Sequence, residues 1–579
     1  MRFPLTPAPW LRRYRRSDLP SDLIAGLTVA VMLVPQGMAY ALLAGMPPVA
    51  GLYASTVPLV AYALVGSSRA LAVGPVAIMS LLTLAGVGAL AEPGSAEFIA
   101  LAGMLALMVG VMQLALGLLR GGVIVAFLSH AVVSGFTSAA AIVIGLSQLK
   151  HLVGVPLESG HPLGALIELA RRASEVHPAT LALGLGAIAL LVLGKRLAPR
   201  FPTPLLMVSV ATALVAVFGL GDVGVRTVGV VPAGLPLPRL PDAPLSALWS
   251  LLPTALTIAF VGFMESIAVA RSLAAKDRER IDADRELSGL GLANLAAGVL
   301  SAFPVTGGFS RSAVNHQAGA RSPLASVVTA LLVALTLLAL TPLFVNLPQA
   351  ALAGLVMVAV TGLIDLREPG HLWRVRRSDA LTLLITFAAT LLIGVEPGLL
   401  AGIAFSLAVF VWRSAFPHIA VMGRLDEQGV WRNVARYPEV RLSRQLVVLR
   451  PDASLYFANA TYLRDVVERA LAERPDAMGL VLDLSAVNDV DAVGLDSLER
   501  LMAELDQRGL EVHLAGMKGP VRDVAARAGW TERHAARAYH LGLDQAVATA
   551  EAACERRRGS AAPTADATPP LSATPNATA

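Results

Sequence analysis

Long apolar blocks fill the greater part of the chain, from about Leu23 to Phe416, and charged residues return at ordinary density beyond Arg424. A bilayer core of about 30 Å is crossed by roughly 20 apolar helical residues, and by fewer where a half-helix is buried in protein. The pattern therefore predicts about fourteen membrane segments and then a soluble domain. The ten clearest segments begin near Leu23, Tyr53, Phe98, Val123, Thr180, Pro204, Leu248, Leu324, Ala380 and Pro397. The four weaker segments cover residues 74–90, 286–302, 309–320 and 349–364.

Basic residues between these segments are unevenly distributed, as the positive-inside rule requires. With a cytosolic N-terminus, the inside loops hold Arg12, Arg13, Arg15, Arg16, Arg69, Arg120, Lys195, Arg196, Arg200, Arg271, Lys276, Arg278, Arg280, Arg285, Arg321, Arg367, Arg374, Arg376, Arg377 and Arg413. The outside loops hold only Lys150, Arg171, Arg172, Arg226 and Arg239. An even number of spans returns the C-terminal domain to the cytosol. We therefore expect a multi-pass inner-membrane protein.

Composition narrows the class of function. Hydrophobic residues make up 55% of the chain and charged residues 15%, and the net charge of +5 is not gathered in one patch, so no nucleic-acid partner is expected. The single cysteine, Cys554, can form neither an internal disulfide nor a thiolate metal site. Most histidines lie in loops, and lone His130 and His316 are interpreted as structural. An enzyme or sensor is therefore disfavoured, and no cofactor or metal is expected.

Two apolar segments are interrupted by glycine and proline at matching positions. The third opens with residues 73–80 and the tenth with residues 303–312, and each is the third in a set of seven. Matched broken helices are typical of transporters built as inverted repeats, here 7+7. A helix that begins inside the membrane directs its free N–H groups and positive dipole end at one spot, so two facing starts favour an anion. A simple kink is the alternative for either segment alone.

These two helix starts define the candidate anion-binding residues, because Arg311 adds a full positive charge to the second. Gln36 and Tyr40, one turn apart in the first span, could donate to an oxyanion or merely join helices. The complete candidate set is Gln36, Tyr40, Pro75, Val76, Ala77, Phe309, Ser310 and Arg311.

Glu265 lies in an otherwise apolar stretch and is the candidate coupling residue. Burial favours the protonated form of a carboxyl group, so Glu265 could take up a coupling proton. It could instead be a structural partner of Arg311. Sodium is a less favoured coupling ion, because Val269, one turn further on, offers no side-chain oxygen.

Four stretches resemble the signatures of the sulfate permease (SulP) family of anion transporters. They are residues 35–53, which begin PQGMAYALLAGMPP, residues 66–77, residues 265–271 (ESIAVAR) and residues 304–313 (PVTGGFSRSA). The resemblance implies a 7+7 inverted repeat with gate and core domains. It also implies an anion between spans three and ten, lined by spans one and eight, and a homodimer. One departure is Asp284-Arg285 before Glu286-Leu287, where the family usually has Asn-Gln.

Beyond about Gln445 the pattern is that of a small α/β domain. Strands are predicted at 446–450, 479–484 and 511–514, and helices at 462–473, 494–508 and 520–528. This resembles a STAS domain, but Asp491 is followed by Ala492, so the hydroxyl that related regulatory domains phosphorylate is missing. The predicted organisation is a cytosolic segment (1–22), a transport domain (23–420), a linker (421–444), the STAS domain (445–556) and a disordered tail (557–579).

The sequence thus favours secondary active transport of a small inorganic anion, most simply sulfate in symport with protons, with alternating access between the two domains. Family membership alone leaves open a sodium- or proton-coupled bicarbonate or dicarboxylate transporter. An uncoupled anion channel is disfavoured by Glu265, whose charge would repel the permeating ion. A nucleobase carrier is disfavoured by Arg311.

Overall fold

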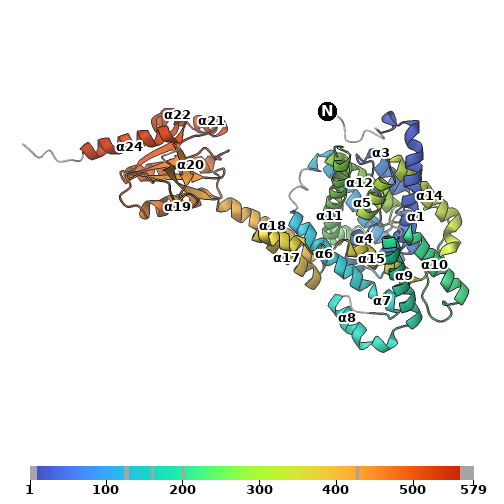
Figure 1. Ribbon diagram of the computed structural model, residues 1–579. Helices are drawn as coiled ribbons and strands as arrows, with labels where there is room; N and C mark the ends of the chain where they lie inside the picture. The colour runs from blue at the N-terminus through green and yellow to red at the C-terminus, as the bar shows by residue number, and fades with distance from the viewer. Residues whose placement is uncertain (1–9, 123–128, 158–161, 198–201, 426–428, 561–579) are drawn as a thin grey trace, which may run out of the picture. The chain divides into compact units, whose positions relative to one another are not determined.

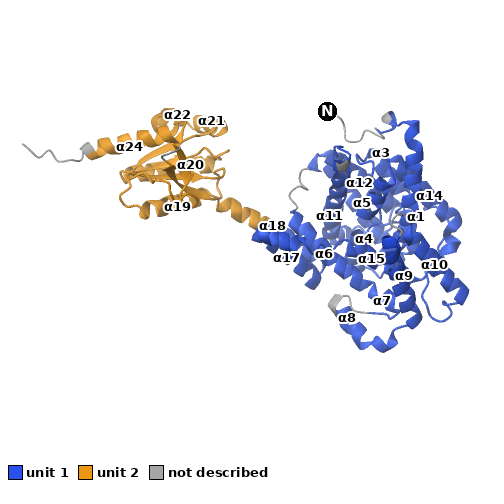
Figure 2. Cartoon of the chain, viewed as in Figure 1, with its two compact units in different colours: residues 1–406 blue, residues 407–579 orange. Residues whose placement is uncertain are grey.

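Figure 1 shows the computed structural model, which describes residues 10–122, 129–157, 162–197, 202–425 and 429–560. The chain divides into two compact units, residues 1–406 and residues 407–579 (Figure 2). Helix α18 (Val395–Ala415) runs through the boundary. Each unit is described by itself.

Unit 1 is built from helices in the predicted segments. The first repeat contains η1 (Leu11–Arg13), η2 (Arg16–Asp18), α1 (Leu19–Leu43), α2 (Pro48–Tyr53), α3 (Val57–Val65), α4 (Ala77–Gly88), α5 (Ala96–Leu118), α6 (His130–Ser147), α7 (Leu149–Val153), α8 (Pro162–Arg171), η4 (Ala173–Glu175), α9 (Pro178–Leu197) and α10 (Thr203–Phe218). The second contains α11 (Ala247–Lys276), α12 (Ala283–Val299), α13 (Phe309–Gln317), α14 (Leu324–Leu335), η5 (Thr336–Leu340), η6 (Thr341–Phe344), α15 (Gln349–Thr361), α16 (Glu368–Val375), α17 (Arg377–Leu392) and α18.

The helix lengths agree with a membrane domain. Within the described ranges, eight helical stretches are long and apolar enough to cross a bilayer, and α4, α10 and α15 are shorter apolar helices. The predicted segment beginning at Val123 starts within 123–128, outside the described residues, and its helix is seen from His130. Helices α12, α13 and α17 occupy further predicted segments. The total of fourteen crossings stays a prediction.

The helices of unit 1 pack in two groups, named here the first and second groups. In the first, α12 packs on α5 and α3, and α1 packs on α14 and α13. In the second, α17 packs on α6, and α15 packs on α9 and α7. The contacts between the groups include those of α1 with α15 and of α4 with α6. Each group draws helices from both repeats, which is the arrangement that an inverted repeat with gate and core domains predicts.

A short crossing joins the two interrupted segments. Strands β1 (Val73–Gly74) and β2 (Thr306–Gly307) pair antiparallel, with Val73 opposite Gly307. Helix α4 starts three residues after β1 and α13 starts two residues after β2. The crossing therefore brings the N-terminal ends of both half-helices close together.

Unit 2 contains a five-stranded sheet in the order β4-β3-β5-β6-β7. Its elements are β3 (Ile419–Leu425), β4 (Val430–Asn433), β5 (Leu446–Pro451), α19 (Ala460–Ala472), β6 (Gly479–Asp483), α20 (Ala492–Gln507), β7 (Glu511–Ala515), α21 (Gly519–Arg527), α22 (Trp530–Arg533), α23 (Ala535–Ala538) and α24 (Leu543–Ser560). The three predicted strands and three predicted helices are all present. Strands β3 and β4, in the segment predicted to be a linker, and helix α24 were not predicted.

Alternation along the strands gives the sheet two apolar faces. Val447 and Leu449 of β5 pack with helices α19 and α20, whereas Leu446 and Val448 pack with α24. At the start of α20, Asp491 accepts a hydrogen bond from Gly494 N–H at 2.6 Å and so caps the helix. The disordered tail was predicted to begin at residue 557, but residues 557–560 belong to α24, so that boundary is wrong; the rest of the predicted tail, 561–579, lies outside the described residues.

Candidate functional site

The two half-helices begin without a side-chain cap. The residue before α4 is Val76 and the residue before α13 is Gly308, and neither side chain bonds the first-turn N–H groups. Uncapped N-termini inside a membrane domain are a favourable environment for an anion. The crossing of β1 and β2 fixes both ends in one place, so their dipoles can act on the same ligand.

Arg311 lies against the backbone of both interrupted segments. A Cβ atom added at Gly308 would come within 2.9 Å of Arg311 Nη2, and one added at Gly74 within 3.4 Å. The two glycines therefore make room for the guanidinium group. Only 2% of Arg311 is exposed, although it is the first-turn cation of a mid-membrane half-helix. A charge buried this deeply is costly unless a partner neutralises it.

Several buried polar atoms near this point have no hydrogen-bond partner among the described residues. They are Nε and Nη2 of Arg311, Oε1 of Gln36 and Oε2 of Glu265. Buried polar atoms in folded proteins are almost always paired, so unpaired donors that gather in one region are suited to bind a polar ligand. Tyr40, Glu265 and Arg311 also lie close enough to interact electrostatically. The atoms left without partners therefore include two donors on the Arg311 guanidinium and one carboxylate oxygen of Glu265.

The other candidate residues are placed differently from one another. Gln36 and Tyr40 of α1 are 5% and 7% exposed, and Pro75, Val76 and Ala77 are buried. Phe309 is 56% exposed and Ser310 is also exposed. Val76, Ala77, Phe309 and Ser310 thus lie at a helix start, where each carries a backbone N–H group, whereas Pro75 has no N–H to donate.

A buried polar network that sequence reasoning missed holds the crossing in place. Ser266, next to Glu265 on α11, lies 2.6 Å from Thr306 through their hydroxyl oxygens and accepts a hydrogen bond from Gly307 N–H at 2.9 Å. Asn294 of α12 accepts from Val305 N–H at 2.8 Å and donates to Val305 O at 3.0 Å. These contacts connect the helix that carries Glu265 to the segment that carries Arg311.

Further contacts tie the far ends of the same elements. Asp277, which follows α11, lies 2.6 Å from Arg69 Nη2 and 2.8 Å from His316 Nε2 of α13.

A separate contact joins α6 to α16, where His130 Nε2 lies 3.6 Å from a Glu368 carboxylate oxygen. Within the described residues no cluster of three metal-ligating side chains is found.

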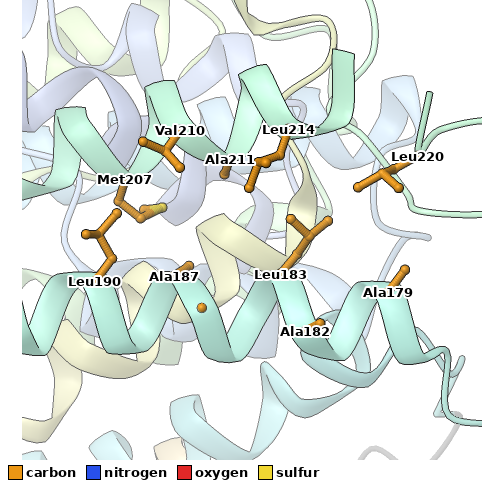
Figure 3. Close-up of a pocket in the computed structure, with 11 residues that line it drawn as sticks. Ala179, Ala182, Leu183, Ala187, Leu190, Met207, Val210, Ala211, Leu214 and Leu220 are labelled. Carbon is orange, nitrogen blue, oxygen red and sulfur yellow. The ribbon is translucent and has the colours of Figure 1, made fainter. Parts of the chain in front are cut away.

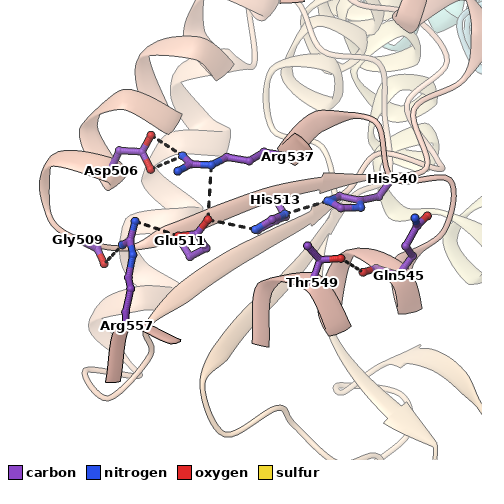
Figure 4. Close-up of polar contacts among 9 residues, drawn as sticks. All are labelled: Asp506, Gly509, Glu511, His513, Arg537, His540, Gln545, Thr549 and Arg557. Atoms are coloured by element: carbon purple, nitrogen blue, oxygen red, sulfur yellow. Dashed lines mark hydrogen bonds and ion pairs between the residues drawn. The ribbon is translucent and has the colours of Figure 1, made fainter. Parts of the chain in front are cut away.

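A second group of titratable residues lies in unit 2 (Figure 4). His513 Nδ1 is 2.9 Å from His540 Nε2, and His513 Nε2 is 3.3 Å from Glu511 Oε1. Arg557 reaches the other Glu511 oxygen at 3.0 Å. Burial lowers the pKa of His513, and the neighbouring His540 lowers it further. Burial also lowers the pKa of His540.

We expect unit 2 to lose stability in mild acid for this reason. A histidine whose pKa is lowered by folding stabilises the fold above its unfolded pKa of about 6.5, and this stabilisation is lost as pH falls below that value. The unfolding temperature of unit 2 in the full-length protein should drop between neutral pH and about pH 5.5. The His513→Gln variant should show a shallower drop in differential scanning calorimetry. An equal drop in both proteins would contradict the assignment to this histidine pair.

A helical membrane bundle in which two half-helix starts and a buried arginine converge is the architecture of transporters with discontinuous helices. The chain belongs to the sulfate permease family, whose model matches residues 19–386, and a STAS domain model matches residues 437–537. The family is one of transporters. The predicted family and C-terminal domain are therefore confirmed.

Individual relatives support the same assignment. The chain is 39% identical over 543 residues to sulfate transporter 4.1, chloroplastic, of Arabidopsis thaliana, which covers 90% of this chain and 79% of that protein. It resembles murine solute carrier 26 family member A9, an anion transporter solved in the inward-facing state, with a TM-score of 0.86, 26% identity, and coverage of 94% and 93%. It also resembles the transmembrane domain of the cyanobacterial bicarbonate transporter BicA, with a TM-score of 0.60, 26% identity, and coverage of 67% and 98%. The helical membrane fold with a C-terminal STAS domain is thereby confirmed.

Proposed function

We propose that this protein is a secondary active transporter of sulfate that binds its anion between the N-termini of α4 and α13. The observation that carries the proposal is the buried Arg311 guanidinium, with two nitrogens unpartnered, against both interrupted segments. An oxyanion can accept hydrogen bonds from the guanidinium and from the uncapped N–H groups of both helices. Gln36 and Tyr40 would line the site from α1.

Two points favour sulfate over bicarbonate. A dianion gains more than a monoanion from one full charge and two positive helix ends, because each interaction scales with the ligand charge. The Arabidopsis relative is named as a sulfate transporter, although the likeness to BicA makes bicarbonate the natural competitor. Uptake of labelled sulfate, bicarbonate and a dicarboxylate into proteoliposomes discriminates among them. Saturable sulfate uptake supports the proposal, and bicarbonate uptake without sulfate uptake would overturn it.

Proton coupling follows from the position of Glu265. Its side chain is partly exposed while Oε2 is buried and unpartnered, and its charge lies within range of Arg311. An ionised Glu265 offsets the charge of Arg311, whereas a protonated Glu265 leaves that charge to the anion. Protonation and anion binding therefore strengthen each other, which is the coupling that symport requires.

We place the N-terminus and the STAS domain in the cytosol, with the transporter in the inner membrane.

Alternating access requires the two helix groups to move relative to each other. A polar bridge between them is the hydrogen bond from Thr254 Oγ1 of α11 to Glu396 Oε1 of α18. Helix α11 packs on α5 of the first group, and α18 packs on α17 of the second. Thr254 is only 2% exposed, so this contact lies inside the packed structure. We propose that the bridge breaks in each transport cycle.

Cross-linking the bridge should therefore stop transport. Cysteines at positions 254 and 396, in a Cys554→Ala background, are joined with a short bis-methanethiosulfonate, and sulfate uptake is measured before and after reduction. We expect uptake to fall by about tenfold or more and to recover with reductant, because the groups can no longer separate.

A matched pair of cysteines at Arg69 and Asp277 tests whether the effect is specific. Both residues belong to the first group and already contact each other at 2.6 Å. Cross-linking this pair should leave uptake largely intact. Full uptake with the 254–396 cross-link in place would show that the two groups do not move apart there.

A further inference from the structure

Helix α16 carries exposed apolar side chains where two membrane helices meet the bilayer surface. It joins α15 to α17, and Trp373 is 48% exposed, Val375 68% and the preceding Leu366 86%. An aromatic residue and aliphatic residues exposed at the end of a span are typical of a segment that lies in the membrane interface. We therefore expect these three side chains to lie against the bilayer.

Four exposed arginines accompany these side chains, namely Arg367, Arg374, Arg376 and Arg377. In the part of the chain that the structure describes none of them lies in a salt bridge, although Arg367 interacts electrostatically with Asp365. Arg374 donates only to Gly370 O within its own helix, at 3.2 Å.

The neighbouring carboxylates make contacts of their own. Asp365 accepts the backbone N–H groups of Arg367 and Glu368 at 2.9 and 3.1 Å, and Glu368 faces His130. Four arginines outnumber the carboxylates Asp365, Glu368 and Asp379 in this stretch. The arginine cluster of α16, meaning Arg367, Arg374, Arg376 and Arg377, therefore presents exposed guanidinium groups and a net positive charge. Such a cluster is complementary to an anionic headgroup.

An apolar groove opens beside this cluster. It has a volume of about 380 Å³ and is lined by α6, α9 and α15, from Ala141 and Gly145 to Thr361 and Ile364. Its lining is almost entirely aliphatic, and Val192 and Thr361 at its edge are exposed. Ile364 precedes Arg367 by three residues, so their Cα atoms are at most about 11 Å apart. The groove thus ends close to the arginine cluster.

We propose that the arginine cluster of α16 and this groove together bind one anionic phospholipid, whose phosphate contacts the arginines and whose acyl chain fills the groove. Guanidinium groups match phosphate geometry, and the aliphatic lining matches an acyl chain. On the predicted topology the lipid belongs to the cytosolic leaflet. This inference goes beyond the proposed function and does not depend on which anion is carried.

Native mass spectrometry of the full-length protein, titrated with phosphatidylglycerol or phosphatidylcholine, tests the headgroup. We expect one phosphatidylglycerol to bind more tightly than phosphatidylcholine. The variant Arg367→Gln/Arg374→Gln/Arg376→Gln should weaken phosphatidylglycerol binding by about tenfold or more. The matched variant Arg271→Gln/Arg278→Gln/Arg280→Gln removes three charges from the same predicted side and should leave it unchanged. Equal binding of both lipids, or equal losses in both variants, would overturn the proposal.

Filling the groove tests the acyl-chain site. A Cβ atom at Gly145 meets nothing within 4 Å, so Gly145→Leu should occupy the groove without distorting α6. The control is Gly186→Leu, in a separate apolar groove between α9 and α10 (Figure 3), where a Cβ atom also meets nothing within 4 Å. We expect Gly145→Leu alone to reduce phosphatidylglycerol binding, by about tenfold. Unchanged binding in Gly145→Leu, or an equal loss in Gly186→Leu, would exclude this groove.

Discussion

Sulfate uptake into proteoliposomes is expected to fall by about 100-fold or more when Arg311 is replaced by alanine, because removing one partner of a buried ion pair costs roughly 3–5 kcal/mol. Stability should respond in the opposite way. Without a bound anion the buried guanidinium keeps two nitrogens without hydrogen-bond partners, so Arg311→Ala should unfold at the same or a higher temperature than the wild type. This combination separates a ligand-binding role from a structural one.

Two comparisons sharpen the Arg311 result. Arg311→Lys keeps the charge but loses the forked geometry, so intermediate uptake is expected. Arg321→Ala removes an exposed arginine four residues beyond α13 and should transport normally. Loss of uptake accompanied by a lower unfolding temperature in Arg311→Ala would instead indicate that the arginine mainly supports the fold.

Replacing Glu265 by glutamine is expected to separate sulfate movement from the proton gradient. In the wild type, each pH unit of inward gradient supplies about 1.4 kcal/mol per proton and so raises the accumulation ratio about tenfold for one coupled proton. Glutamine mimics the protonated carboxyl and cannot release a proton. Glu265→Gln should therefore equilibrate sulfate across the membrane without accumulating it, as measured by labelled uptake at several imposed gradients.

The control for Glu265 is Glu396→Gln, which removes a carboxylate from α18 rather than from the candidate site. That variant should change the rate of uptake but keep the response to the gradient. Gradient-driven accumulation that persists in Glu265→Gln would place the coupling group elsewhere, and a response to sodium in the wild type would replace the proton as the coupling ion.

Local signals made the candidate site predictable from the sequence. A glycine-proline pair within an apolar stretch interrupts a helix, and an arginine at such an interruption is costly without a role, so Pro75 and Arg311 stand out. The pairing of β1 with β2 brings the two helix starts together. The roles assigned to Gln36, Tyr40 and Glu265 stay predictions.

The supporting network was not predictable in the same way. Ser266 and Asn294 are ordinary small polar residues in apolar helices, and only the fold shows that they hold Gly307 and Val305. The exposure of Phe309 also depends on how α13 packs, which the sequence of a nine-residue half-helix does not show. The sequence shows that a polar residue lies within a span, but it does not show which group that residue hydrogen-bonds.

In unit 2 the fully buried strands were easy to recognise, and the partly exposed elements were not. Strands β3 and β4 have partly exposed, mixed sequences, and β4 lies at the edge of the sheet. Helix α24 covers its sheet face with small residues, namely Ala546, Ala550 and Cys554, which give a weak apolar signal at helical spacing. The predicted homodimer likewise depends on the surface of the folded chain, which a local sequence pattern does not describe.

The most direct test of the anion site is equilibrium binding of labelled sulfate to purified full-length protein, comparing wild type with Arg311→Ala and Arg321→Ala. Binding is measured rather than transport, so neither coupling nor domain movement affects the result. We predict saturable binding by the wild type and by Arg321→Ala, and no detectable binding by Arg311→Ala. Undiminished sulfate binding by a folded Arg311→Ala protein would contradict a site built from Arg311 and the two helix ends.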